Sequence, residues 1–126
     1  MPVVSGKRYF FNVCPGDQYS AEADEKETEI IRIGPHRFSE KGFERANNEV
    51  LDSFEKYNIL IIDEIGRIEL NNKGFAPSLN VIMKNKNKLK EIDLILVVRE
   101  ELVEQVTNNF GISDFKIITD IYDINL

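Results

Sequence analysis

Two adjacent carboxylates, Asp63 and Glu64, are the side chains of this sequence best placed to do chemistry. They follow the apolar run Ile59–Ile62, which has no polar face and therefore predicts a strand buried on both sides in a parallel sheet. The carboxyl ends of such strands face the ligand crevice of open α/β sheets, where an acidic pair can hold Mg²⁺ and orient a water molecule. The same pair could equally be an ordinary solvated end of a core strand.

More side chains are expected at the same edge of the sheet. Gly66, just after the pair, lets the backbone turn sharply or approach a ligand closely. Residues 92–98 predict a second buried strand that ends at Arg99, and residues 115–119 predict a third that ends at Asp120. Because parallel strands end at one edge, Arg99 and Asp120 should meet the acidic pair there. Carboxylates with an arginine suit Mg²⁺ and an anionic phosphate substrate.

The helices that position this edge have clear signals. Ser39 is placed to cap a helix whose start is fastened by a hydrophobic staple between Phe38 and Phe43. Apolar residues then recur at helical spacing: Phe43, Ala46, Val50, Leu51, Phe54 and Tyr57. Pro77 predicts the first turn of a second helix, and Gly111 the left-handed end of a third. The alternation predicts an α/β fold, a three-layer sandwich with a mainly parallel sheet.

The N-terminal part is expected to add an antiparallel strand pair. Its strands are predicted at residues 7–13 and 28–33, with an acidic loop at 17–27 that is either a solvated connection or a lid. The lone His36 is expected to be a surface side chain of a Gly-Pro turn. The lysines of residues 84–90 are expected to be a solvated helix end, since they complement the macrodipole and no aromatic residues are interleaved for base stacking.

Composition limits the classes of function. Of 126 residues, 42% are hydrophobic and 30% charged, which is typical of one globular domain over residues 1–126. The net charge of −6 argues against a surface that binds nucleic acid. The single Cys14 excludes an internal disulfide and favours a reducing compartment. Without a long apolar run or a signal-peptide pattern, we expect a cytoplasmic protein with no membrane segment.

Residues 63–70, Asp-Glu-Ile-Gly-Arg-Ile-Glu-Leu, with Phe75 a few residues on, resemble the Walker B segment of a known family. The family is the small P-loop nucleoside-triphosphatases that include the cancer-related nucleoside-triphosphatase. Residues 6–10 are similar to one of its strands, and residues 33–46 to the approach to its Walker B strand. The likeness covers most of the chain, but only the first segment is highly specific.

This resemblance implies a nucleoside triphosphate as substrate and Mg²⁺ as cofactor. By the same resemblance, Asp63 would hold Mg²⁺ through water, and Glu64 would orient or deprotonate the attacking water. Gly66 would lie in the cofactor-binding segment, and Arg99 would correspond to a basic residue near the phosphates in some members.

The glycine-rich loop that defines the family, G-x-x-x-x-G-K-[ST], is not found in the sequence. Residues 5–8, Ser-Gly-Lys-Arg, resemble its end, but the preceding glycine is missing and Arg8 replaces the Ser or Thr that binds magnesium. We therefore expect the portion with this loop to be missing and the chain alone to be a weak or inactive nucleoside-triphosphatase. A split half completed by a second polypeptide, a degenerate relative and a chain trimmed at its N-terminus all fit this expectation.

Three functions remain open on the sequence. The first is nucleoside triphosphate binding and hydrolysis. The second is a non-catalytic binding or assembly module on the same scaffold, whose open sheet edge pairs with another chain and whose function survives Glu64→Gln. The third is a metal-dependent nuclease that uses Asp63, Glu64 and Glu69, which the acidic surface and the absence of a clustered basic residue disfavour.

Overall fold

The centre of the fold is a pair of parallel strands, β6 (Ile59–Ile65) and β7 (Asp93–Val98), seen in a computed structural model. The structure describes residues 3–4, 7–13 and 16–119. Both strands are rich in β-branched residues and leucine, which pack well on a pleated surface. Leu60 pairs with Leu94 and Ile62 with Leu96, so the alternate positions of both strands face one core. The two strands confirm the expected parallel sheet.

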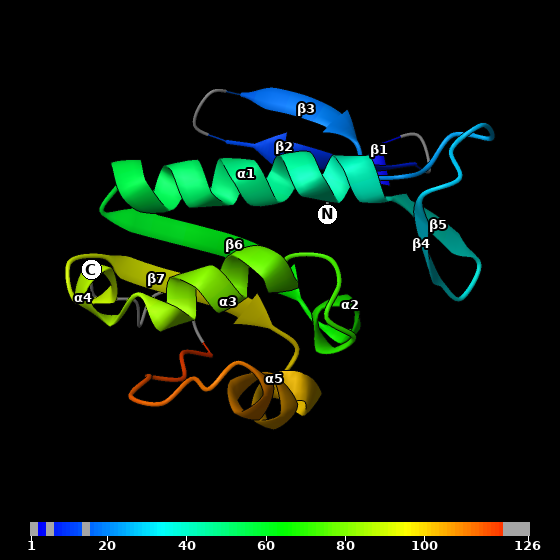
Figure 1. Cartoon of the computed structure of the whole chain (residues 1–126). Helices are drawn as coiled ribbons and strands as arrows, with labels where there is room; N and C mark the ends of the chain where they lie inside the picture. The colour runs from blue at the N-terminus through cyan, green and yellow to red at the C-terminus, as the bar shows by residue number, and fades with distance from the viewer. Residues whose placement is uncertain (1–2, 5–6, 14–15, 120–126) are drawn as a thin grey trace.

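Helices on one side of this pair form that core (Figure 1). They are α1 (Glu40–Lys56), α2 (Arg67–Leu70), α3 (Ala76–Lys84), α4 (Lys86–Leu89), the 3₁₀ turn η1 (Glu100–Leu102) and α5 (Val103–Asn109). The start of α1 agrees with the sequence, because Ser39 Oγ accepts the Gly42 N–H at 3.1 Å. The buried core residues are Phe54, Leu60, Ile62, Ile65, Ala76, Leu79, Ile82, Leu102, Val106 and Phe110. Helices and strand ends are therefore held by one apolar cluster.

The N-terminal part contains two antiparallel units. β1 (Val3–Val4), β2 (Lys7–Asn12) and β3 (Asp17–Ser20) form one sheet, and β4 (Ile30–Ile33) and β5 (His36–Ser39) form a hairpin. The predicted pairing of residues 7–13 with 28–33 is therefore wrong, although both strands exist. Closing a short hairpin costs less chain entropy than closing a long loop, and this favours the local partners.

The acidic segment 17–27 is consequently not one loop. Its first part is β3, and its later part is tied back to β5 by the Arg37 guanidinium, which donates to the carbonyls of Asp24 and Glu27 at 3.5 and 3.3 Å. His36 also lies in β5 instead of the turn, half-buried, with Nδ1 2.9 Å from a guanidinium nitrogen of Arg8.

Within the described residues, one face of the β6–β7 pair is largely uncovered, which corrects the expectation of a strand buried on both sides. Ile59, Ile61 and Val97 are 44%, 59% and 45% exposed, whereas Leu60 and Ile62 between them are buried. The helices cover only the face that Leu60 and Ile62 present. The strand is therefore apolar on both faces but packed on one in the described residues.

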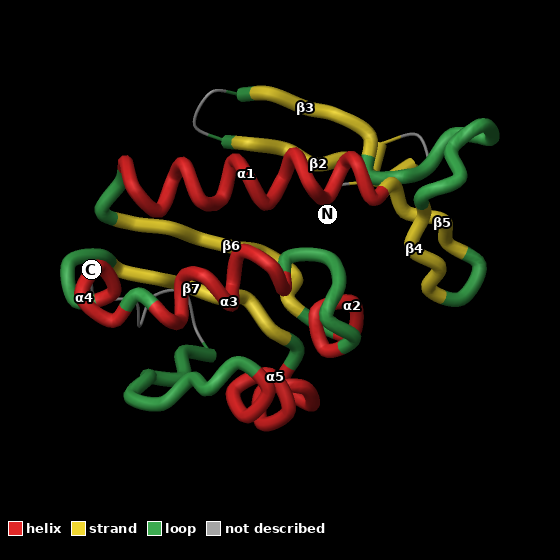
Figure 2. Tube along the Cα trace, in the orientation of Figure 1, coloured by secondary structure: helices red, strands yellow, loops and turns green. Residues whose placement is uncertain are grey.

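The predicted third strand is also wrong. Residues 115–119 form a loop after α5 (Figure 2), and Phe115 and Ile117 are 50% and 61% exposed. An apolar run forms a strand only when a neighbouring edge supplies hydrogen-bond partners. Asp120, the expected end of that strand, lies outside the described residues. The fold class stands: a parallel strand pair and antiparallel strands combined with helices form an α/β structure.

No helix in the described ranges combines the length and the apolar character required to cross a lipid bilayer.

Candidate nucleotide site at the end of β6

Asp63 and Glu64 lie in a β-bulge near the end of β6. Ile62 pairs with Leu96 and Ile65 with Val98, so two residues of β6 oppose one residue of β7. In a regular strand Ile62 and Ile65 would face opposite sides of the sheet. Because of the bulge both are buried, at 3% and 1% exposure, while the two carboxylates between them are exposed. The irregularity thus presents both carboxylates to solvent between two anchored isoleucines.

The sharp turn of this segment occurs at Glu64. Its φ is 60°, a left-handed value that a residue with a Cβ seldom adopts. Gly66, expected to allow a sharp turn or the close approach of a ligand, joins β6 to α2 with a φ of −162°, an extended value, so the left-handed residue lies two positions earlier. A Cβ at Gly66 would meet only Leu102 Cδ1, at 3.6 Å. Left-handed non-glycine residues cluster at functional sites, where the surrounding structure imposes the strain.

Arg99 emerges at the same edge. Ile65 pairs with Val98, so Gly66 and Arg99 each follow directly after paired residues of adjacent parallel strands. Arg99 is exposed and precedes η1, whose first residues are Glu100 and Glu101. The parallel register therefore places a guanidinium-bearing residue and an acidic pair at one edge of the sheet, as the sequence predicts.

Glu69 has a different environment from the acidic pair. It is 2% exposed, and its Oε1 accepts the Gly66 N–H at 2.8 Å while Oε2 accepts the Phe75 N–H at 3.0 Å. Burial raises the pKa of the Glu69 carboxyl, and the two backbone N–H groups oppose this in part. With both oxygens engaged and shielded from solvent, Glu69 is not available as the third metal ligand of the nuclease hypothesis.

The exposed carboxylates suit Mg²⁺ better than a metal held entirely by protein. Magnesium keeps several waters and binds through one or two carboxylates together with substrate phosphates. In the part of the chain that the structure describes, no group of three or more His, Cys, Asp or Glu side chains could enclose a metal ion. Asp63 and Glu64 are exposed carboxylates of the kind that such a partly hydrated Mg²⁺ complex uses.

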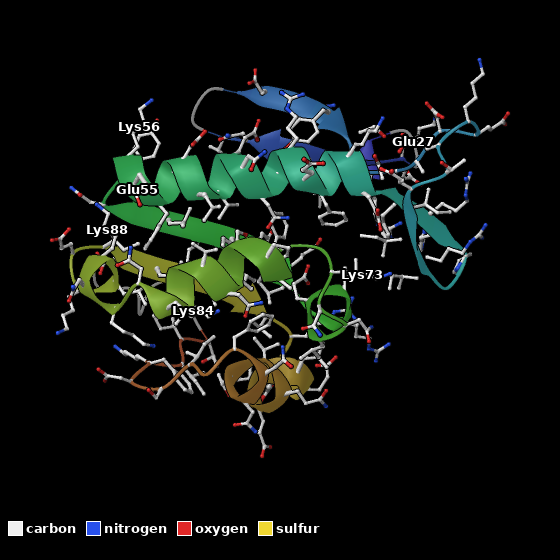
Figure 3. All side chains as sticks on the ribbon, in the orientation of Figure 1. Glu27, Glu55, Lys56, Lys73, Lys84 and Lys88 are labelled. Carbon is white, nitrogen blue, oxygen red and sulfur yellow. The ribbon has the colours of Figure 1, made fainter. Side chains whose placement is uncertain are left out.

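A surface hollow of about 360 Å³ lies between α2 and the β4–β5 hairpin. It is lined by Ile31, Arg32, Ile33, Ile68, Asn71 and Lys73. Figure 3 shows Lys73 in the region between α2 and the β4–β5 hairpin. The hollow therefore has two cationic side chains, Arg32 of β4 and Lys73 after α2, and α2 is the helix that follows the acidic pair.

The lysines near the end of α3 lie elsewhere. Figure 3 shows Lys84 and Lys88 at the end of the molecule away from α2. Lys88 lies 3.8 Å from a Glu91 carboxylate oxygen, a partly exposed contact within the same turn. These positions agree with a solvated helix end, because β6 runs away from these lysines toward α2.

Comparison with known proteins places the chain in a family. A family model described as NTPase matches residues 4–123. The chain is thus a nucleoside-triphosphatase-type α/β domain, and it belongs to this small P-loop NTPase-like family. No curated protein matches it. No solved structure matches it either.

Sequence reasoning missed the bulge, the left-handed Glu64 and the buried role of Glu69. Only the last had a local signal, because Gly66-x-x-Glu69 has the spacing of a capping box, in which the acidic side chain reaches back to the backbone N–H. The bulge had none, since it depends on which residues of β7 lie opposite.

Proposed function

We propose that this chain carries the magnesium and water-positioning part of a nucleoside triphosphate binding and hydrolysis site. The observation that supports it most is the bulge, which exposes Asp63 and Glu64 together between buried Ile62 and Ile65. Bulges are uncommon in parallel pairs and are over-represented next to active sites. Family membership supports a nucleoside triphosphate as the class of substrate. The proposed location is the cytoplasm, which is rich in Mg²⁺ and nucleotide.

The roles follow from charge and position. When bound, Mg²⁺ would neutralise charge on the β- and γ-phosphates. The Asp63 carboxylate would hold the ion through water, and Gly66 would leave room for the ligand beside it. The Glu64 carboxylate would accept a hydrogen bond from the attacking water and later its proton. Arg99 would donate to phosphate oxygens as their negative charge increases.

Binding through this edge alone omits the donors that usually surround the phosphates. We propose that a segment outside residues 1–126 supplies the glycine-rich loop, and that residues 1–126 by themselves turn over nucleotide slowly or not at all. Each missing electrostatic contact in such a site is worth about 3 kcal/mol of transition-state stabilisation. Nucleotide binding is therefore a sharper test of this chain than hydrolysis.

The test is calorimetry of a non-hydrolysable nucleoside triphosphate analogue with and without Mg²⁺. We expect micromolar affinity that depends on Mg²⁺ and falls at least about tenfold in Asp63→Ala, a loss of about 1.4 kcal/mol. Asp93→Ala is the matched control, because Asp93 is an exposed aspartate at the opposite end of the same strand pair. Absence of Mg²⁺-dependent binding, or equal loss in both variants, would overturn the proposal.

The open face of the sheet favours a second function, an assembly module. Ile59, Ile61 and Val97 expose apolar surface on a two-stranded sheet whose outer edges have no strand partner among the described residues. Such edges and patches promote association with another chain. We expect the purified protein to self-associate with rising concentration in light scattering after size exclusion, and Ile61→Lys to abolish this. A wild-type protein that stays monomeric throughout would count against a second copy as the cover.

A further inference from the structure

A buried polar cluster is joined to the end of β6 by a hydrogen bond between Gly66 and Glu69. Glu69 of α2, Asn47 of α1 and Gly74 of the connection to α3 are all buried. Glu69 bonds two backbone groups within one connection, whereas Asn47 bonds Gly74 and Ser78, which are distant from it in the sequence. The proposed hydrolysis assigns no role to these hydrogen bonds. Buried polar groups are costly unless satisfied, so a satisfied cluster fixes the backbone around it.

The Glu69 carboxylate connects the two ends of the segment between β6 and α3. One oxygen accepts from Gly66, the residue directly after the bulge and its anchor Ile65, and the other accepts from Phe75, directly before α3. The ring of Phe75 packs edge-on against Phe43 and Phe10, with centroids 5.7 and 6.1 Å apart. The carboxylate thus links the end of β6, through Phe75, to the packed rings of Phe10 and Phe43.

The surroundings of Glu69 leave little freedom for this link. Gly74 has a φ of 60°, and a Cβ there would overlap Glu69 Oε2. The Gly74 carbonyl accepts from Asn47 Nδ2 at 2.8 Å, and Asn47 Oδ1 accepts the Ser78 N–H at 3.0 Å. The loop is therefore held on its outer side by α1 and α3 while Glu69 holds it from within.

We propose that Glu69 is the positioning residue of the candidate site, and that its carboxylate fixes the direction in which Asp63 and Glu64 leave the end of β6. The inference depends on the proposed function only for the identity of the ligand that Asp63 and Glu64 bind. The left-handed Glu64 has to be imposed by its surroundings, and the bonded Gly66 amide after Ile65 is one such constraint. Without the carboxylate acceptor, Gly66 and Phe75 would each retain a half-buried N–H that has lost its acceptor, and the bulge would relax.

The first test follows backbone amides by NMR in wild type, Glu69→Gln and Glu69→Met. Glutamine keeps the shape but replaces one acceptor with a donor, and methionine removes both acceptors. We expect the Gly66 and Phe75 amides to exchange about tenfold faster, the worth of one hydrogen bond, with a larger effect for methionine. The Cα and Cβ shifts of Glu64 should leave their left-handed values, while the amides of Leu60 and Ile62 remain protected.

The second test repeats the Mg²⁺–nucleotide titration with Glu69→Gln, and Glu104→Gln, an exposed glutamate of α5, is the control. Affinity about tenfold weaker in Glu69→Gln, under conditions where both variants are folded, supports positioning. Unchanged shifts of residues 63–66 in both Glu69 variants, or uniform loosening of all amides, would overturn it. If the wild type binds no nucleotide, the proposed function fails, and the amide exchange at Gly66 and the Glu64 shifts still decide the role of Glu69.

Discussion

The acidic pair Asp63–Glu64 and the nearby Glu69 carry the same functional group, a carboxylate, but their different environments suit them to different roles. The pair is exposed in a bulge, where water and ions reach it. Glu69, one short turn later, is 2% exposed and bonds two backbone amides. A carboxylate in water can exchange ligands, whereas a desolvated one must keep the donors it has. Substitutions at the pair should therefore alter binding with little change in stability, whereas substitutions at Glu69 should lower stability and weaken binding only through the position of the pair.

The largest expected effect comes from filling the space beside Glu69. Gly74→Ala places a methyl group against Oε2 at a φ of 60°, so we expect it to cost about 3 kcal/mol of unfolding free energy. Gly34→Ala is the matched control, with a φ of 58° but no atom within 4 Å of its Cβ, and should cost about 1 kcal/mol. Urea unfolding measures both, and equal losses would show that Glu69 tolerates displacement.

Removing the buried carboxylate should come next. Glu69→Ala leaves the Gly66 and Phe75 amides without acceptors, and we expect a loss of about 2 kcal/mol in unfolding free energy. Asp63→Ala should change stability by less than about 0.5 kcal/mol, because its side chain is exposed. Chemical denaturation of both variants tests the contrast directly, and a larger loss at Asp63 would reverse our assignment of the two tasks.

Relief of the backbone strain at position 64 should raise the free energy of unfolding by a smaller amount. Both Glu64→Ala and Glu64→Gly remove the side chain, but only glycine adopts a φ of 60° without steric cost. After allowing for the greater unfolded-state freedom of glycine, we expect Glu64→Gly to be more stable than Glu64→Ala by roughly 0.5 to 1 kcal/mol. Thermal unfolding of the pair settles this, and the opposite order would mean that Glu64 is unstrained in solution.

The smallest expected effect is a change in the free energy of unfolding with pH. Burial raises the pKa of Glu69 above its ordinary value, so the folded chain binds this proton more tightly than the unfolded chain. The resulting stabilisation is complete below about pH 4.5 and is lost as pH rises through the raised folded pKa. The stability of wild type relative to Glu69→Gln should therefore fall across that window in a series of urea titrations. A difference that is constant with pH would show that the folded and unfolded pKa values are equal.

Local features of the sequence predicted several elements correctly. The Ser39 cap begins α1, and Phe38 and Phe43 form the expected staple with ring centroids 6.1 Å apart. Pro77 lies in the first turn of α3, and Gly111 has the left-handed φ of 63° that ends α5. These signals succeed because hydrogen bonds and sterics within a few residues decide them.

Nonlocal features were not predictable in the same way. The partners of β2 and β4 depended on competing closure entropies, and the two apolar faces of β6 could not reveal that helices cover only one. Residues 115–119 have the composition of a strand, but in the described residues they form a loop that pairs with neither edge of the β6–β7 sheet.

The sequence by itself determined the parallel pair, the helices that join it and the acidic residues at its carboxyl end, since apolar periodicity and the order of elements settle these. Only the tertiary structure decided how the carboxylates are presented. The register of β7 against β6 creates the bulge that exposes Asp63 and Glu64, and Asn47 of α1 holds the Gly74 loop that lies against the buried Glu69. Both depend on contacts between segments far apart in the chain, which no local pattern encodes.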